Sequence, residues 1–127
     1  MSFETDLYSR LSNDPEVAAL VDTRIYPLVA PPEPTSPFCV CSILSKTNTN
    51  SHSGFGDISQ YKVQVSCYAD TYQTAKDVAN AVTSALKTWP GAQGAQAVFR
   101  SNEHDLYDKD NNLYHVPVEF LIIYKEI

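Results

Sequence analysis

The chain has 127 residues, 43% of them hydrophobic and 11% aromatic, so it can bury a core without disulfides or a bound metal. Fifteen acidic residues against nine basic ones give a net charge of −6, which argues against the basic surface of a nucleic-acid-binding protein. No apolar run reaches the roughly 18 residues of a membrane span, and the first residues do not resemble a signal peptide. We expect one domain over residues 1–127 with no membrane partner.

The spacing of apolar residues at the N-terminus predicts an α-helix. Phe3, Leu7 and Leu11 recur at helical spacing. Asp14 followed by Pro15 is typical of a second helical start, because aspartate caps a helix and proline is tolerated in its first turn. The pattern leaves open whether the two pieces are two helices or one kinked helix.

The segment from Pro27 to Pro37 contains five prolines, which exclude a helix and predict an extended crossing segment. A Pro-rich peptide ligand is the alternative interpretation, and the apolar stretches on both sides disfavour it. The following stretch, residues 37–45, is apolar at alternate and intervening positions and predicts a strand covered on both faces. Residues 58–69 alternate strictly between apolar and polar, which predicts a second strand paired with the first as a hairpin.

Between these two strands lies a polar run from Lys46 to Asp57, with glycines on both sides of Phe55. No hydrophobic period survives in it, so we expect a long exposed loop within residues 46–59. Loops of this length are uncommon in compact domains and are usually functional or disordered.

Residues 70–91 predict the longest helix. Asp70 is the expected N-cap, Gln73 completes an arrangement like a capping box, and Pro90 with Gly91 ends the helix. One apolar stripe follows the helical period: Tyr72, Ala75, Ala79, Val82, Leu86 and Trp89. The fold class that follows is α+β, with a mixed or mainly antiparallel sheet of four to five strands, helices mainly on one face, and one long projecting loop.

The stretch from Asp108 to Glu119 resembles a calcium-binding loop, because Asp108, Asp110, Asn112 and Glu119 match the spacing of its ligands. The required glycine is replaced by Leu113, and period-two alternation follows where a calcium loop would need a helix. We therefore expect a turn between two strands rather than an ion site.

Catalytic and metal-binding patterns are weak in this sequence. We expect Cys39, Cys41 and Cys67 to be buried, reduced thiols, since they lie in apolar segments and lack a fourth ligand. His104 and His115 are expected to lie near one another across the last hairpin. Spacing leaves a Cys–His nucleophilic pair open, but no catalytic motif supports it, and we expect neither a cofactor nor enzyme activity.

The order of the segments resembles the tail-completion (tail-terminator, or tail-to-head joining) family of long-tailed bacteriophages and related prophages. Three stretches carry the resemblance, namely RIYPLVAP with the following PF, VQVSCYADTYQTA, and DLYD with LYHVPVEF, and it extends over residues 14–124. The resemblance implies a structural virion protein that closes the head-proximal end of the tail tube as a hexameric ring, stops tube growth and joins the tail to the head.

The resemblance also implies partners: further copies of the chain, the tail tube protein, and a head–tail connector or stopper protein. DNA would pass through the ring without sequence-specific binding, and assembly would take place in the host cytoplasm. The loop is the natural contact segment, with these candidate residues: Lys46, Asn48, Asn50, His52, Phe55 and Asp57. Another neck component, such as a head-completion or stopper protein, is the nearest alternative, and a small cytosolic enzyme or ligand-binding domain is a more distant one.

Overall fold

The computed structural model describes residues 3–32, 34–49, 57–90 and 95–126. In chain order the elements are α1 (Phe3–Ser12), α2 (Pro15–Val21), β1 (Ile25–Pro27), β2 (Phe38–Thr49), β3 (Asp57–Ala69), α3 (Tyr72–Lys87), β4 (Ala95–Glu103), β5 (Leu106–Asp108) and β6 (Leu113–Glu126). None of the helices in these ranges is long and apolar enough to cross a membrane.

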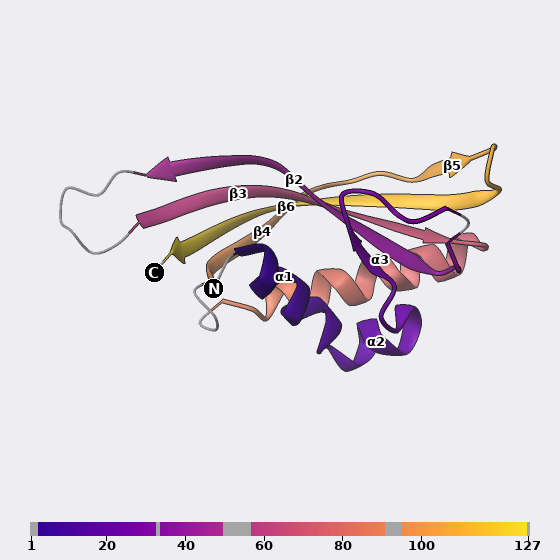
Figure 1. The fold of residues 1–127 in the computed structure, drawn as a ribbon, viewed down its shortest axis with the longest axis horizontal. Helices are drawn as coiled ribbons and strands as arrows, with labels where there is room; N and C mark the ends of the chain where they lie inside the picture. The colour runs from indigo at the N-terminus through magenta and orange to yellow at the C-terminus, as the bar shows by residue number, and fades with distance from the viewer. Residues whose placement is uncertain (1–2, 33, 50–56, 91–94, 127) are drawn as a thin grey trace.

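Within the described residues the strands form one six-stranded sheet in the order β1-β2-β3-β6-β4, and β5 pairs with the start of β6 along the same edge that β4 occupies further on. Only β1 and β2 are parallel, and the three helices lie on one face of the sheet (Figure 1). The predicted α+β class is confirmed. The sheet has more strands than the four or five expected, because β1 and β5 have three residues each, too few for a period-two pattern to reveal them.

The core lies between the sheet and the helices, and the predicted alternation of the two central strands is confirmed. Strand β3 buries Tyr61, Val63, Val65, Cys67 and Ala69, and β6 buries Val116, Val118, Phe120, Ile122 and Tyr124. Of the predicted stripe of α3, every residue except the exposed Tyr72 is buried against this face. The small alanines in the stripe let the helix approach the sheet closely.

The N-terminal segment forms two helices. Asp14 separates them, and its carboxylate accepts a hydrogen bond of 3.1 Å from the amide of Val17, as predicted for an N-cap. Helix α1 is held by Phe3, whose ring stacks on Tyr61 with centroids 3.7 Å apart. The Tyr124 hydroxyl also donates a hydrogen bond to the buried carboxylate of Asp6. These contacts place α1 across the central strands.

The N-cap of α3 is Thr71, so the prediction of Asp70 is wrong. The Thr71 hydroxyl accepts a hydrogen bond of 3.2 Å from the amide of Thr74, while Asp70 precedes the helix as an exposed residue. Both residue types are good caps, and the strand before the helix ends at Ala69, so the choice depends on where the chain turns.

Replacing Thr71 by alanine is expected to lower the free energy of unfolding by about 1 kcal/mol, because an amide of the first turn loses its acceptor. Urea denaturation would measure the change. Asp70→Ala is the matched control and should leave stability nearly unchanged. The reverse ranking of the two variants would show that Asp70 caps the helix in solution.

Candidate functional site

The predicted loop is shorter than the sequence indicated, because both strands of the hairpin extend into it. Strand β2 continues to Thr49 and β3 begins at Asp57, with Thr47 opposite Gln60 and Thr49 opposite Ile58. The candidate contact residues Lys46, Asn48 and Asp57 are therefore strand residues, and the loop prediction is wrong at these positions. Asn50, His52 and Phe55 lie outside the described residues.

The physical reason for this difference is the position of the hairpin. Figure 1 shows β2 and β3 extending past the end of the helical layer, where backbone hydrogen bonds of the ladder hold β2 and its side chains from Ser45 to Thr47 are exposed. A polar strand of this kind has no hydrophobic period. The Lys46 ammonium lies 5.4 Å from the centroid of the Tyr61 ring, which links this part of the hairpin to the core.

The expectation that β2 is covered on both faces holds only for its first residues. Phe38 and Val40 are buried, whereas Leu44 is 47% exposed and Ile43 is 36% exposed. The register shifts between Ile43 and Ser45, so Leu44 is the extra residue of a β-bulge. Apolar side chains are thus presented to solvent where the strand leaves the core.

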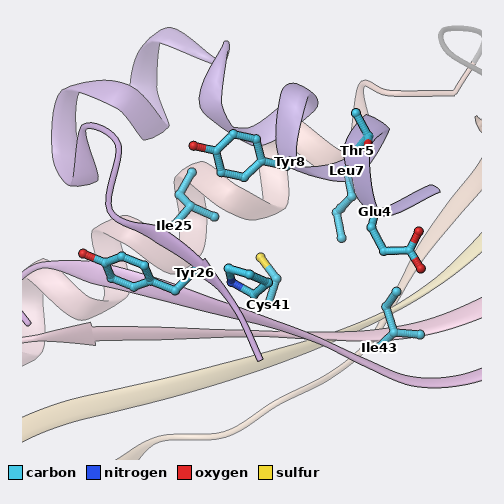
Figure 2. A pocket seen from close by; sticks show the side chains of 9 residues that line it. Glu4, Thr5, Leu7, Tyr8, Ile25, Tyr26, Cys41 and Ile43 are labelled. Atoms are coloured by element: carbon cyan, nitrogen blue, oxygen red, sulfur yellow. The ribbon is translucent and has the colours of Figure 1, made fainter. Parts of the chain in front are cut away.

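A groove opens beside this part of β2 (Figure 2). It has a volume of about 380 Å³ and lies between α1, β1 and β2. Its lining is mainly apolar: Glu4, Thr5, Leu7, Tyr8, Ile25, Tyr26, Pro27, Cys41 and Ile43. No sequence pattern indicates this groove, because three elements that are separate in the chain have to meet before it exists.

The half-buried Cys41 lines this groove, while Cys39 and Cys67 are fully buried opposite one another on β2 and β3. Burial raises the pKa of the Cys41 thiol well above its ordinary value. A hydrogen bond with Cys67 and burial likewise raise the pKa of Cys39. None of the three cysteines forms a disulfide. The raised pKa values of Cys39 and Cys41 favour the protonated thiol, which is a poor nucleophile and a poor metal ligand.

The face of the sheet opposite the helices carries a row of aromatic rings across β2, β3 and β6. Phe38 stacks on Tyr68 with centroids 4.8 Å apart, and Tyr68 stacks on His115 at 4.2 Å. Burial lowers the pKa of His115, so the imidazole is held neutral. His115 lies opposite Leu106 on β5, while the His104 amide donates to the carbonyl of Pro117, so the two histidines are not the cross-strand pair we expected.

The stretch that resembled a calcium loop is a turn between β5 and β6, as predicted. One carboxylate oxygen of Asp108 accepts hydrogen bonds from the amides of Asp110 and Asn111, at 3.0 and 3.4 Å. The other accepts one of 2.8 Å from the Asn111 side chain, and these bonds lower the pKa of Asp108. Asn112 takes the left-handed conformation with φ of 55°, and Glu119 is carried away along β6. Over the ranges that the structure describes, no three His, Cys, Asp or Glu side chains are grouped as a metal site.

We expect that neither calcium nor EDTA changes the melting temperature of the protein, because the Asp108 carboxylate is already used by the turn. A thermal melt with millimolar calcium and with EDTA measures this. A rise of several degrees with calcium alone would contradict the assignment, since a ligand that binds the native state stabilises it by mass action.

The chain matches the model of a known protein family. The family model described as Tail completion protein gp17 matches residues 5–125. A chain in the solved structure titled "Virion of native gene transfer agent (GTA) particle" is similar in fold, with a TM-score of 0.73 over 98% of this chain and 96% of that chain. The sequence identity is 20%, so this likeness concerns the fold alone. A search of curated protein sequences gives no match.

Proposed function

This chain belongs to the tail completion protein gp17 family, and from that premise we propose that it is one subunit of a hexameric ring that closes the head-proximal end of a phage tail tube. The ring would stop tube growth and offer the surface on which the head, through its connector or stopper protein, is joined. The match over residues 5–125 carries the proposal, because it spans nearly all of the sheet and helices described above. The family is one of structural tail proteins, and we assign no catalytic role to the chain.

The charge of the chain supports a passage for DNA rather than a binding site for it. The net charge is −6, and a ring of six such subunits would repel the phosphate backbone. DNA in transit between head and tail must not be held by the walls of the channel. A negative ring therefore suits passage without sequence-specific contacts.

The contact segment of the proposed ring is the far end of the β2–β3 hairpin, with Lys46, Asn48, Asn50, His52, Phe55 and Asp57 as the candidate residues. The position of the hairpin supports this assignment, because its described part extends past the helical layer (Figure 1). An apolar anchor such as Phe55, surrounded by polar residues, is the composition that interfaces use for a central contact. We assign its partner as the neighbouring subunit or the tail tube.

Replacing residues 50–56 by Asn-Gly tests this assignment. The replacement closes the hairpin with a short turn, so the melting temperature should change by only a few degrees, because shortening a surface loop costs little free energy. Tail completion should be impaired, giving tubes of irregular length or tails without heads. A seven-residue Gly/Ser replacement, which keeps the loop length, separates the loss of side chains from the loss of reach. Infectious particles at the normal yield from both variants would contradict the role of this segment.

A further inference from the structure

The sheet has two open edges. Strand β1 pairs with β2 only from Cys39 to Cys41, and among the described residues no strand pairs with the outer side of β2 from Ser42 to Thr49. At the opposite end of the strand order, no strand of the described residues lies on the outer side of β4. Unpaired strand edges are templates for pairing with another chain.

Strand β1 ends early because the backbone turns off the edge. Leu28 takes a positive φ of 63°, which is uncommon for a residue with a Cβ, and its amide donates the last bond of this edge to the carbonyl of Cys41. The proline-rich segment that follows cannot continue a strand ladder. The edge of β2 beyond Cys41 is thereby left open.

The two open edges lie at the same height in the sheet. Following the register across the strands, Thr47 lies opposite Gln60, Gln60 opposite Ile123, and Ile123 opposite Ala97. By the same path, Ser42 is level with Asn102. A ring formed by rotation alone has no rise from one subunit to the next, so matched heights are what edge-to-edge pairing in a ring requires.

The strand directions also fit. Strand β2 is antiparallel to β3, β3 to β6, and β6 to β4, so β4 runs antiparallel to β2 within one subunit. A second copy that continues the same sheet keeps that relation. Its β4 would therefore meet the open part of β2 as an antiparallel neighbour, which is the more stable pairing.

Each open edge carries an exposed large apolar side chain next to polar and charged ones such as Lys46 on β2 and Arg100 on β4. Phe99 on β4 is 57% exposed, and Leu44 on β2 is 47% exposed. Both strands contain bulges, and between them Ala97, Val98 and Phe99 are level with Thr47, Lys46 and Ser45. Contact between the two edges would cover Phe99 and Leu44, which a lone subunit leaves in water.

The charges near the groove fit the same arrangement. Arg100 is level with Ile43 and, because it lies opposite the buried Phe120, its side chain leaves the sheet on the helical face. Ile43 and the acidic Glu4 both line the groove on that face (Figure 2). The Arg100 guanidinium lies 3.5 Å from the Glu103 carboxylate of its own chain, and a neighbouring copy would bring this pair to the mouth of the groove near Glu4.

We propose that β4 of one copy adds to the open segment of β2 of the next copy, so that an antiparallel sheet runs continuously round the ring. The two contacting surfaces, the open edge of β4 and the open edge of β2, differ from one another. The contact is therefore head-to-tail, which is the type that closes into a ring. This inference rests on the proposed ring function and specifies which surfaces form it.

Cross-linking tests the pairing directly. A variant carrying Thr47→Cys and Ala97→Cys is treated with a short bis-maleimide that spans about 7 Å, which allows a shift of two residues along the strand. We expect a ladder of covalent oligomers that ends at the mass of the ring. Each single variant should give no ladder, a mixture of the two single variants should give dimers, and the parent protein measures the background from Cys41. Ser45→Cys with Ser101→Cys is a second pair for the case that the first does not fold.

The mass of the variant in solution, measured without cross-linker, distinguishes failure of the strand pairing from failure of the ring. A ring by mass without a ladder from either pair would overturn the strand pairing and leave the ring function standing. A protein that remains monomeric at every concentration would contradict the ring and the pairing together.

Discussion

Replacing Phe3 by alanine is expected to lower the free energy of unfolding by about 3–5 kcal/mol, the usual cost of emptying a large aromatic site in a core. Phe3 is 1% exposed, stacks on Tyr61, and meets the edge of Tyr124 with ring centroids 5.1 Å apart. The cavity would lie between α1 and the central strands, where the rigid sheet cannot collapse to fill it. Urea denaturation followed by circular dichroism measures the change.

Tyr8→Ala is the matched control on the same helix. Tyr8 is 44% exposed at the rim of the groove, so its loss should cost about 1 kcal/mol. Equal destabilisation by the two substitutions would show that α1 does not pack on the sheet as described.

The second large effect is on assembly. Phe99→Asp is expected to raise the protein concentration needed for ring formation at least tenfold, or about 1.4 kcal/mol for each contact. A charge replaces the exposed aromatic at the centre of the open edge of β4, where a partner strand would have to desolvate it. The folded subunit should be little affected, because the side chain is 57% exposed. Sedimentation or mass photometry over a concentration series gives the measurement.

Leu106→Asp is the control for this prediction. Leu106 is 53% exposed and, like Phe99, lies on a strand that pairs with the outer side of β6. By register Leu106 is level with Phe38. At that height Arg24 and β1 cover the outer edge of β2, so no open edge is available there. Substitution of Leu106 should leave ring formation unchanged. Loss of the ring with Leu106→Asp but not with Phe99→Asp would move the contact away from the proposed edge.

Much of the fold was predictable where side chains alternate against a core. The strict pattern of residues 58–69 and the face from Tyr114 to Tyr124 predicted the two central strands, and the structure confirms both. The Asp14-Pro15 start was also predicted, since a cap and an N-terminal proline act locally. Such features depend on neighbours in the chain.

The features of the fold that the sequence did not predict depend on contacts between segments that are distant in the chain. The polar end of β2 in the β2–β3 hairpin has no hydrophobic period, because backbone pairing with β3 holds it and its side chains from Ser45 to Thr47 are exposed. The three-residue β1 exists because Ile25 and Pro27 fall beside Cys39 and Cys41, which no local pattern reveals. The groove and the two open edges likewise depend on the order of the strands in the sheet, and no single segment of the sequence determines that order.

The proposed role of this chain is to complete tails as a ring at the head-proximal end of the tube. Its most direct test is electron microscopy of tails produced by the encoding phage or phage-like element with and without the chain, with tube length and head attachment counted. We expect uniform tubes joined to heads when the chain is present, and headless tubes of irregular length when it is absent. Tubes of normal length joined to heads in its absence would contradict the account.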